Sequence, residues 1–450
     1  MQENKMGVMP VNRLLISMSL PMMISMLVQA LYNVVDSVFV SKINENALTA
    51  VSLAFPIQTL MIALGAGTGV GVNALLSKSL GEKNLDKANK SAANGVFLAL
   101  VNYIIFLLVG IFVTGPFYLS QTKDAQILAY GKEYLTIVCC CSFGMYTQFI
   151  FERLLQSTGK TFYTMIAQGA GAIINIILDP VFIFGYLGMP RMGVAGAAVA
   201  TVIGQIAAGI IAVVINEKKN TEIKLQIRGF KPDMRIIKQI YQVGIPSIIM
   251  QSIGSVMTYG MNQILMAFTS TAAAVFGVYF KLQSFIFMPV FGLNNGMVPI
   301  VAFNYGAGKK ERLIQTVKLS IIYAMCLMVI GFLVFQIMPW QLLALFEASE
   351  TMLAIGVPAL RTISYSFLLA GFCIISGSMF QALGNGVYSM IVSIARQLVV
   401  LLPAAYLLSL TGEISYVWWA FPIAEFMSLI LSVFFMVRIY KKVIKHIGKS

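Results

Sequence analysis

Charged residues are scarce in this sequence. Only 11% of its 450 residues are Asp, Glu, Lys or Arg, whereas 58% are hydrophobic. Soluble domains carry about 25% charged residues, so the composition excludes an ordinary soluble protein. Apolar runs of about 20 residues recur along the whole chain, which is typical of membrane-spanning helices.

Histidine and paired cysteines are also scarce. The one histidine, His446, lies in a basic segment, and three of the five cysteines, Cys139 to Cys141, are consecutive in an apolar stretch. Neither a CxxC pair nor a His cluster is present to indicate metal or disulfide chemistry. The sequence also lacks the catalytic His, metal cluster or paired interfacial acids that an intramembrane enzyme would need. We therefore expect a protein that is not an enzyme and uses no cofactor.

Hydropathy predicts an all-α integral membrane protein with about 12 transmembrane helices. The approximate limits of the spans are 13–40, 47–77, 91–115, 126–150, 161–186, 193–215, 238–268, 272–302, 313–338, 352–380, 387–410 and 414–440.

The net charge of +14 comes mainly from Lys and Arg in the segments between spans. If the N-terminus is cytoplasmic, 24 of the 31 Lys and Arg residues fall on the cytoplasmic side and five on the outer side. The positive-inside rule therefore predicts that both termini are cytoplasmic. The same rule explains the charge without a nucleic-acid partner, so the expected surroundings are the lipid bilayer.

The two halves of the sequence repeat each other at a constant offset of 225 residues. Without a gap, this shift aligns Pro21 with Pro246, Gly67 with Gly292, Gly71 with Gly296, and Gln156 with Gln381. Such a run of matches indicates an internal duplication. Each half holds about six spans, so the two copies face the same way.

This duplication predicts two pseudo-symmetric lobes of six helices each. The N-lobe covers residues 1–215, a basic cytoplasmic linker covers 216–237, and the C-lobe covers 238–450. Substrate sites in such transporters lie near mid-membrane. Because one chain already contains both lobes, a monomer is sufficient.

Two aspartates lie inside predicted spans of the first half. Asp36 is in "QALYNVVDSVFV" and Asp179 is in "NIILDPVFIF". A charged residue at the bilayer centre costs about 2.5–3.5 kcal/mol on translocon scales, so it is a functional candidate by default. Helical spacing places Gln29 and Asn33 on the face of Asp36, and Asn175 on the face of Asp179. The alternative is a hydrogen-bonded network that only holds helices together.

These residues suit the coupling of transport to an ion. A buried carboxyl group can take up and release a proton, and two carboxylates with amide oxygens can hold Na⁺ at Asp36, Asn175 and Asp179. The residues do not separate H⁺ from Na⁺. Pro21 and Pro180 each remove a helix hydrogen bond. They either kink their helices or act as hinges that respond to the state of the aspartates.

The second half lacks both acids, because the duplicate positions of Asp36 and Asp179 are Met261 and Ala404. Polar residues remain in its spans, and Tyr259, Asn262 and Gln283 are candidates for substrate binding or a polar network. Lys281, Arg396 and Glu425 also fall within spans. We predict that Arg396 faces protein or water and pairs with Glu425.

The chain resembles the MATE (multidrug and toxic compound extrusion) transporters of the bacterial DinF-like and MepA-like branch. The stretches that carry the resemblance are "SLPMMISMLVQALYNVVDSVFVS", "NIILDPVFIFG", "GIPSIIMQS", "GMVPIVAFNYGAGKKER" and "MFQALGNG". The resemblance implies a V-shaped fold of two lobes and twelve helices that alternates access. It also implies drug export by H⁺ or Na⁺ antiport.

The resemblance assigns roles to individual residues. Six residues match the family's N-lobe cation site and its polar surroundings: Asp36, Asn175, Asp179, Thr201, Tyr134 and Gln29. Pro21 matches a proline that is proposed to bend the first helix. One departure concerns the C-lobe glutamate that the NorM-like branch carries eight residues after the seventh-span proline. Here that position is Gly254, so coupling is expected to depend on the N-lobe.

The combined prediction is a multidrug efflux antiporter of the bacterial cytoplasmic membrane. Its substrates are expected to be organic, cationic, amphipathic, drug-like small molecules. A flippase for lipid-linked saccharides or lipids, from the same wider superfamily, is the alternative. It would use basic residues such as Lys281 and Arg396 to bind a pyrophosphate.

Overall fold

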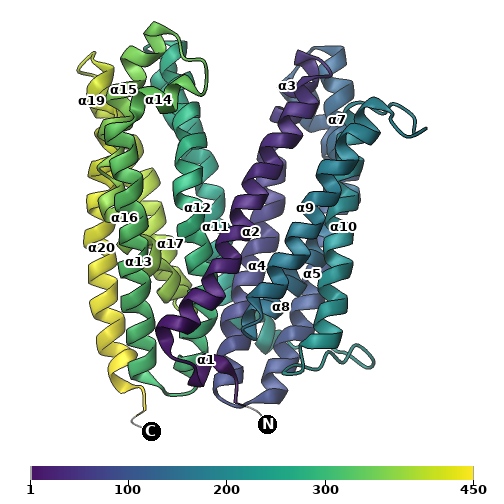
Figure 1. Ribbon diagram of the computed structural model, residues 1–450, viewed down its shortest axis with the longest axis vertical. Helices are drawn as coiled ribbons and strands as arrows, with labels where there is room; N and C mark the ends of the chain where they lie inside the picture. The colour runs from purple at the N-terminus through teal and green to yellow at the C-terminus, as the bar shows by residue number, and fades with distance from the viewer. Residues whose placement is uncertain (1–2, 449–450) are drawn as a thin grey trace. The chain divides into compact units, whose positions relative to one another are not determined.

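The computed structural model describes residues 3–448, which are almost entirely helical (Figure 1). The long single helices are α2 (Val11–Ser41), α4 (Phe55–Gly81), α5 (Leu85–Phe112), α9 (Thr161–Phe184), α10 (Val194–Lys219), α11 (Met234–Met266), α12 (Ser270–Gly306) and α13 (Lys310–Ile337). Two spans are bent pairs: α7 (Ala125–Cys140) with α8 (Phe143–Ser157), and α15 (Glu350–Ser364) with α16 (Phe367–Ala382).

The last two spans are interrupted helices. One consists of α17 (Gly386–Ile394), the π-helix η1 (Ala395–Leu401) and α18 (Leu402–Ser409), and the other of α19 (Ile414–Val417), α20 (Ala420–Lys442) and the 3-10 turn η2 (Ile444–His446). Short helices α1 (Lys5–Val8), α3 (Glu45–Leu53), α6 (Thr114–Gln121) and α14 (Pro339–Ala344) complete the chain. Among residues 3–448, ten helices can cross a membrane, or twelve segments if each bent pair is one span. The predicted all-α membrane fold is confirmed.

Polar side chains at the connecting turns define where several helices begin. Asn44, Asp124, Thr269 and Ser349 each accept a hydrogen bond from a backbone N–H of the first turn that follows. Such caps satisfy donors that have no partner within the helix. Gly185, with φ of 77°, ends α9 in a left-handed conformation that glycine adopts without strain.

The chain divides into two compact units whose limits differ from those of the predicted lobes. Unit 1 contains residues 1–23 and 245–450, and unit 2 contains residues 24–244. The first half of α2 therefore belongs with the second half of the sequence, and the first turns of α11 belong with the first half. Pro21 and Pro246 lie within two residues of the two boundaries.

In unit 1, the N-terminal segment packs on α12 and the start of α13. A Cβ added at Gly296 would overlap Ser19, and one at Gly292 would overlap the backbone of Met23. The Arg312 guanidinium donates hydrogen bonds to the Met6 and Met9 carbonyls at 3.0 and 2.7 Å. These contacts fix the start of the chain to the second half.

In unit 2, the start of α11 packs on α4 in the corresponding way. A Cβ at Gly71 would overlap the carbonyl oxygen of Ile240, and Gly67 lies against Gly244. The structure thus explains why Gly67 and Gly71 are repeated at positions 292 and 296. Each glycine pair lets a neighbouring helix approach the backbone closely, as small residues do between membrane helices.

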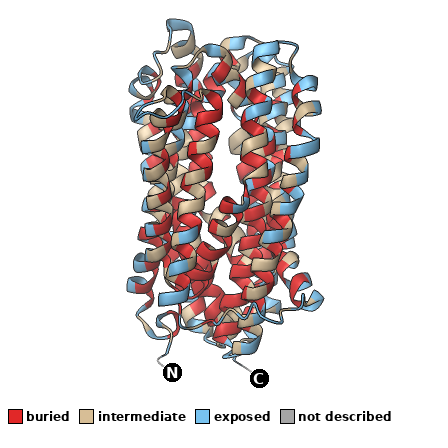
Figure 2. Ribbon diagram, turned by 90° about the vertical axis from the view of Figure 1, so that its right-hand side faces the viewer, coloured by how far each residue is buried: buried red, intermediate tan, exposed pale blue. Residues whose placement is uncertain are grey.

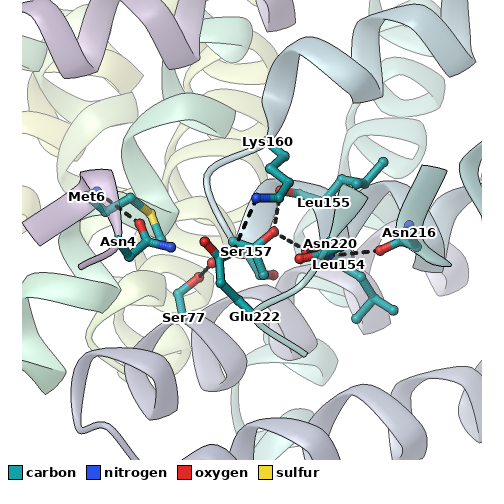
Figure 3. Close-up of polar contacts among 11 residues, drawn as sticks. Asn4, Met6, Ser77, Leu154, Leu155, Ser157, Lys160, Asn216, Asn220 and Glu222 are labelled. Carbon is teal, nitrogen blue, oxygen red and sulfur yellow. Dashed lines mark hydrogen bonds and ion pairs between the residues drawn. The ribbon is translucent and has the colours of Figure 1, made fainter. Parts of the chain in front are cut away.

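The predicted linker, residues 216–237, is part of unit 2. Its first residues continue α10, and beyond them Glu222 forms an ion pair with Lys160 at 3.6 Å in the turn between α8 and α9 (Figure 3). The backbone N–H groups of Lys224 and Asp233 donate to Asn89 and Asn94 of α5 at 2.8 and 3.0 Å. This basic segment is therefore held on α5 and α8 and does not form a free connector.

Buried residues lie on the helix faces that point into each unit, and exposed residues lie on outward faces and turns (Figure 2). Many outward residues are large and apolar, for example Ile173 and Ile177 on α9 and Ile210 on α10. Helices that are apolar on their outer as well as their inner faces are expected in a bilayer.

Candidate ion-coupling site

Close packing of α9 against α10 creates the polar centre of unit 2. A Cβ added at Gly171 would lie 2.8 Å from the carbonyl oxygen of Gly204, and one at Gly204 would lie 2.8 Å from the carbonyl oxygen of Gly171. The backbones therefore touch one helical turn before Asn175. Small residues at this crossing bring the polar side chains of the two helices into one place.

Three predicted site residues are buried at this crossing. Asn175 and Asp179 on α9 are 2% and 0% exposed, and Thr201 on α10 is 6% exposed. Helical periodicity explains the arrangement, because Asn175 and Asp179 are one turn apart on the inner face of α9, whereas Ile173 and Ile177 are on the outer face. The helix continues through Pro180 to Phe184.

The second aspartate comes from α2. Asp36 is half-buried, and its carboxyl group lies near that of Asp179. Two residues 143 positions apart in sequence are thus brought near each other. Tyr32, one turn before Asp36, lies next to Thr201 and near both carboxyl groups. Sequence reasoning missed Tyr32, although its spacing of four from Asp36 was a signal.

Buried polar atoms without hydrogen-bond partners are concentrated in this cluster. Within residues 3–448, they include Asp36 Oδ1, both oxygens of Asp179, both polar atoms of the Asn175 amide, and Thr201 Oγ1. Buried polar atoms are nearly always hydrogen-bonded in folded proteins, so such a concentration calls for a functional explanation. The oxygen atoms form a donor set suited to a proton or a hard cation.

Tyr134 flanks the cluster from α7. It is buried, lies close to Asp36, and its hydroxyl accepts a hydrogen bond from Gln58 Nε2 of α4 at 3.1 Å. Gln58 was not among the predicted site residues. Its hydrogen bond holds the tyrosine that the prediction did include.

The remaining predicted residues of α2 separate into two environments. Gln29 accepts a hydrogen bond from Gln168 Nε2 of α9 at 2.9 Å, and Gln168 in turn accepts one from Ser25 at 2.6 Å. Gln29 is therefore part of a polar chain between α2 and α9. Asn33 is exposed and is not brought into the buried cluster.

In unit 1, Tyr259 and Asn262 lie on α11 and Gln283 lies on α12. Tyr259 is 68% exposed, and Asn262 and Gln283 are half-buried. Lys281 is exposed, with its ammonium 5.9 Å from the centre of the Phe346 ring.

The pairing predicted for Arg396 is confirmed, because its Nη1 lies 3.3 Å from Glu425 Oε2. A further buried acid, Glu152 on α8, was not predicted. It accepts a hydrogen bond from Gln148 at 2.9 Å. The predicted span ended at residue 150 and so placed this acid outside the membrane.

These features define a class of protein. Two units of apolar helices are repeated in sequence, and unit 2 contains an acid on each of two membrane-spanning helices, α2 and α9. Such a combination is typical of a secondary transporter. A model of the MatE family matches residues 21–181 and again residues 246–407. The chain therefore belongs to this family of membrane transporters, and it is a multi-pass membrane protein.

Relatives and solved structures agree with this assignment over nearly the whole chain. The "Multidrug export protein MepA" of Staphylococcus haemolyticus is 28% identical over 92% of this chain and 91% of its own length. A crystal structure of a MATE in complex with MaL6 has a TM-score of 0.92 at 25% identity and full coverage of both chains. An outward-facing multidrug resistance MATE family transporter has a TM-score of 0.90 at 26% identity, with 100% of this chain and 99% of that one covered.

Proposed function

We propose that this chain exports organic, cationic, amphipathic drug-like compounds across the bacterial cytoplasmic membrane in exchange for H⁺ or Na⁺. The substrate class is supported by the similarity to multidrug export proteins over 92% of the chain. The antiport is supported by the buried acid cluster. The excess of Lys and Arg in the predicted cytoplasmic segments supports cytoplasmic termini.

The observation that carries the proposal is that Asp36 and Asp179 lie near each other among buried polar atoms that have no partners within the described chain. Two adjacent carboxylates repel each other, and the repulsion is strong where water is excluded. A proton or a Na⁺ ion bound between them removes the repulsion. The oxygens of Asn175 and Thr201 can then complete the coordination of a metal cation, or accept a hydrogen bond from a protonated carboxyl group.

Coupling follows if the ion and the substrate favour different states of the transporter. Substrate binds from the cytoplasmic side, and the ion enters at Asp36 and Asp179 from outside and lowers the affinity for substrate there. Only such a difference in affinity between states can drive export. Pro21 lies two residues from the point where α2 passes from one unit to the other, which makes it a suitable hinge. Pro180, directly after Asp179, is the second hinge candidate.

The flippase alternative gains no support from Arg396, one of the two basic residues named for it. Arg396 is paired with the nearly buried Glu425, so its charge is already neutralised by a carboxylate. A pyrophosphate would have to displace that carboxylate.

The test is export of a fluorescent cationic dye from an efflux-deficient bacterial strain that expresses Asp36→Asn or Asp179→Asn. Both variants should insert normally and abolish export, because an amide neither titrates nor binds Na⁺ as a carboxylate does. The matched control is Asp86→Asn, since Asp86 is 77% exposed in a surface ion pair with Lys90. Wild-type export by both variants would refute ion coupling at this site.

The coupling ion is identified in inverted membrane vesicles. An imposed pH gradient and an imposed Na⁺ gradient are applied separately, and dye accumulation is measured. The gradient that drives accumulation in the wild type, and fails to do so in Asp179→Asn, identifies the ion. Accumulation driven by neither gradient would contradict antiport.

A further inference from the structure

Unit 1 contains a charged pair of its own. Arg396 lies on the π-helix η1 and Glu425 on α20, with Nη1 and Oε2 3.3 Å apart. The Glu425 side chain is 7% exposed and that of Arg396 is 35% exposed. The pair thus joins a nearly buried carboxylate to a guanidinium that is partly exposed.

This pair lies close to the duplicate of the ion site in unit 2. At the offset of 225 residues, the counterparts of Asn175 and Thr201 are Val400 and Phe426. Arg396 is one helical turn before Val400, and Glu425 directly precedes Phe426. The pair therefore joins the two helices that correspond to α9 and α10, within one turn of the positions that hold the cluster in unit 2.

The π-helix is a second, independent sign that this location is specialised. Residues 395–401 form a π-helix in unit 1, whereas α9 is an α-helix from Thr161 to Phe184. Short stretches of π-helix within α-helices are rare and occur frequently at functional sites. In this chain, η1 covers residues 395–401 and contains Arg396.

Besides Arg396 of η1, polar groups from α12, α16 and α20 lie near Glu425. Tyr279 of α12 lies near both Glu425 and Arg396, and Cys373 of α16 lies near Glu425 together with Ser428 and Ser432. Among these groups, only Arg396 is a cation. Glu425 is therefore surrounded by the kinds of neutral donors and acceptors that surround Asp179, but with a cation already attached to the protein.

We propose that Arg396 acts as a tethered cation in a monovalent cation site of unit 1, and that Glu425 binds H⁺ or Na⁺ once Arg396 is removed. This inference rests on the proposed function, because it assumes that the related site in unit 2 binds the coupling ion. A guanidinium keeps its proton at every physiological pH, and it is covalently attached. Unit 1 is consequently locked in its ion-bound form, and only the Asp36–Asp179 site exchanges an ion during transport.

The experiment uses purified full-length protein in lipid nanodiscs. Binding of radioactive Na⁺, and proton uptake on acidification, are measured in a background that carries Asp36→Asn and Asp179→Asn. Arg396→Met is added to that background alone or together with Glu425→Gln, and Arg396→Lys is the charge-conserving control. We expect the background to bind neither ion through the acids. Adding Arg396→Met should create about one binding site, which Glu425→Gln should abolish, and Arg396→Lys should create none.

Two results would overturn the proposal. One is that Arg396→Met binds no more ion than Arg396→Met/Glu425→Gln although both elute as monodisperse protein. The other is that Arg396→Lys gains as much binding as Arg396→Met. If Arg396→Met does not fold, Arg396→Gln replaces it with the same expectations.

Failure of the proposed function gives a different result. It would appear as equal binding by the wild type and the Asp36→Asn/Asp179→Asn background. The proposed site at Glu425 is tested separately. Its measure is the difference in ion binding between Arg396→Met and Arg396→Met/Glu425→Gln in that background.

Discussion

Units 1 and 2 share a helical plan but differ in how their central charges are compensated. In unit 2, Asp36 and Asp179 lie side by side among polar atoms without partners in the described chain. In unit 1, the counterparts of these acids are Met261 and Ala404, and the nearby Glu425 is paired with Arg396. Unit 1 thus adopts the repeated helical plan without an acid pair. This difference favours a functional rather than a structural reason for the pair in unit 2.

Common to both units is the close approach of a helix to paired glycines. The start of α11 packs against Gly67 and Gly71, and the start of α2 packs against Gly292 and Gly296. The comparison therefore separates two kinds of duplicated position. Those that permit backbone contact have been kept in both halves, whereas those that carry charge have diverged.

The largest effect on transport is expected when the acid of unit 2 is moved to the corresponding position of unit 1. In the variant Asp179→Asn/Ala404→Asp, we expect complete loss of dye export. The new acid would lie beside Val400 and Phe426 and would lack the amide and hydroxyl partners that Asn175 and Thr201 provide. Export is compared with Asp179→Asn alone, and recovery to even a tenth of wild-type activity would show that the two units are chemically interchangeable.

The shared packing is tested by enlarging one glycine in each unit. Gly71→Val and Gly296→Val should each lower the thermal stability of the purified protein strongly, because the added side chain would overlap Ile240 or Ser19. Overpacking of this kind costs about 1–3 kcal/mol or more. Gly169→Val and Gly277→Val are the controls, since a Cβ at either position meets no atom within 4 Å. Wild-type melting temperatures for the two test variants would contradict the close approach.

A smaller effect on transport is expected when Asn175, the amide beside the two aspartates, is replaced. Asn175→Ala should weaken coupling-ion binding by about ten- to a hundredfold, since a hydrogen bond or ligand to a charged group contributes about 1.5–3 kcal/mol. Val400→Ala, the same position in unit 1, should leave the ion affinity unchanged. The apparent affinity is read from the dependence of dye transport on the concentration of the driving ion. Equal shifts in both variants would argue against a role specific to unit 2.

The smallest effect concerns an ion pair in the linker of unit 2. Lys160 and Glu222 are 3.6 Å apart with side chains 22% and 30% exposed, so Lys160→Met should cost less than about 1 kcal/mol of stability. Arg396→Met, which leaves a nearly buried carboxylate without its partner, should cost more in the same thermal assay. A larger loss for Lys160→Met than for Arg396→Met would reverse this ranking.

Much of the molecule was predictable because membrane insertion imposes simple rules. The span count, the duplication and the candidates Asp36, Asn175 and Asp179 follow from hydropathy, a constant offset and the cost of charge in a bilayer. The Arg396–Glu425 pair was predicted for the same reason, since two rare charges in one membrane region tend to neutralise each other. Tyr32 was missed because tyrosine is common in apolar spans, so its spacing of four from Asp36 was not enough to single it out. Glu152 was missed because the predicted span was too short.

The sequence by itself determined which residues are helical, which are repeated and which are costly to bury, since these depend on local composition and spacing. Only the tertiary structure decided that residues 1–23 pack with the second half and residues up to 244 with the first, because that exchange depends on contacts between glycines and helices far apart in the chain. It also decided that Asp36 meets Asp179 while Asn33 remains exposed. Helical spacing restricts a side chain to one face of its helix, but the neighbouring helices decide what that face contacts.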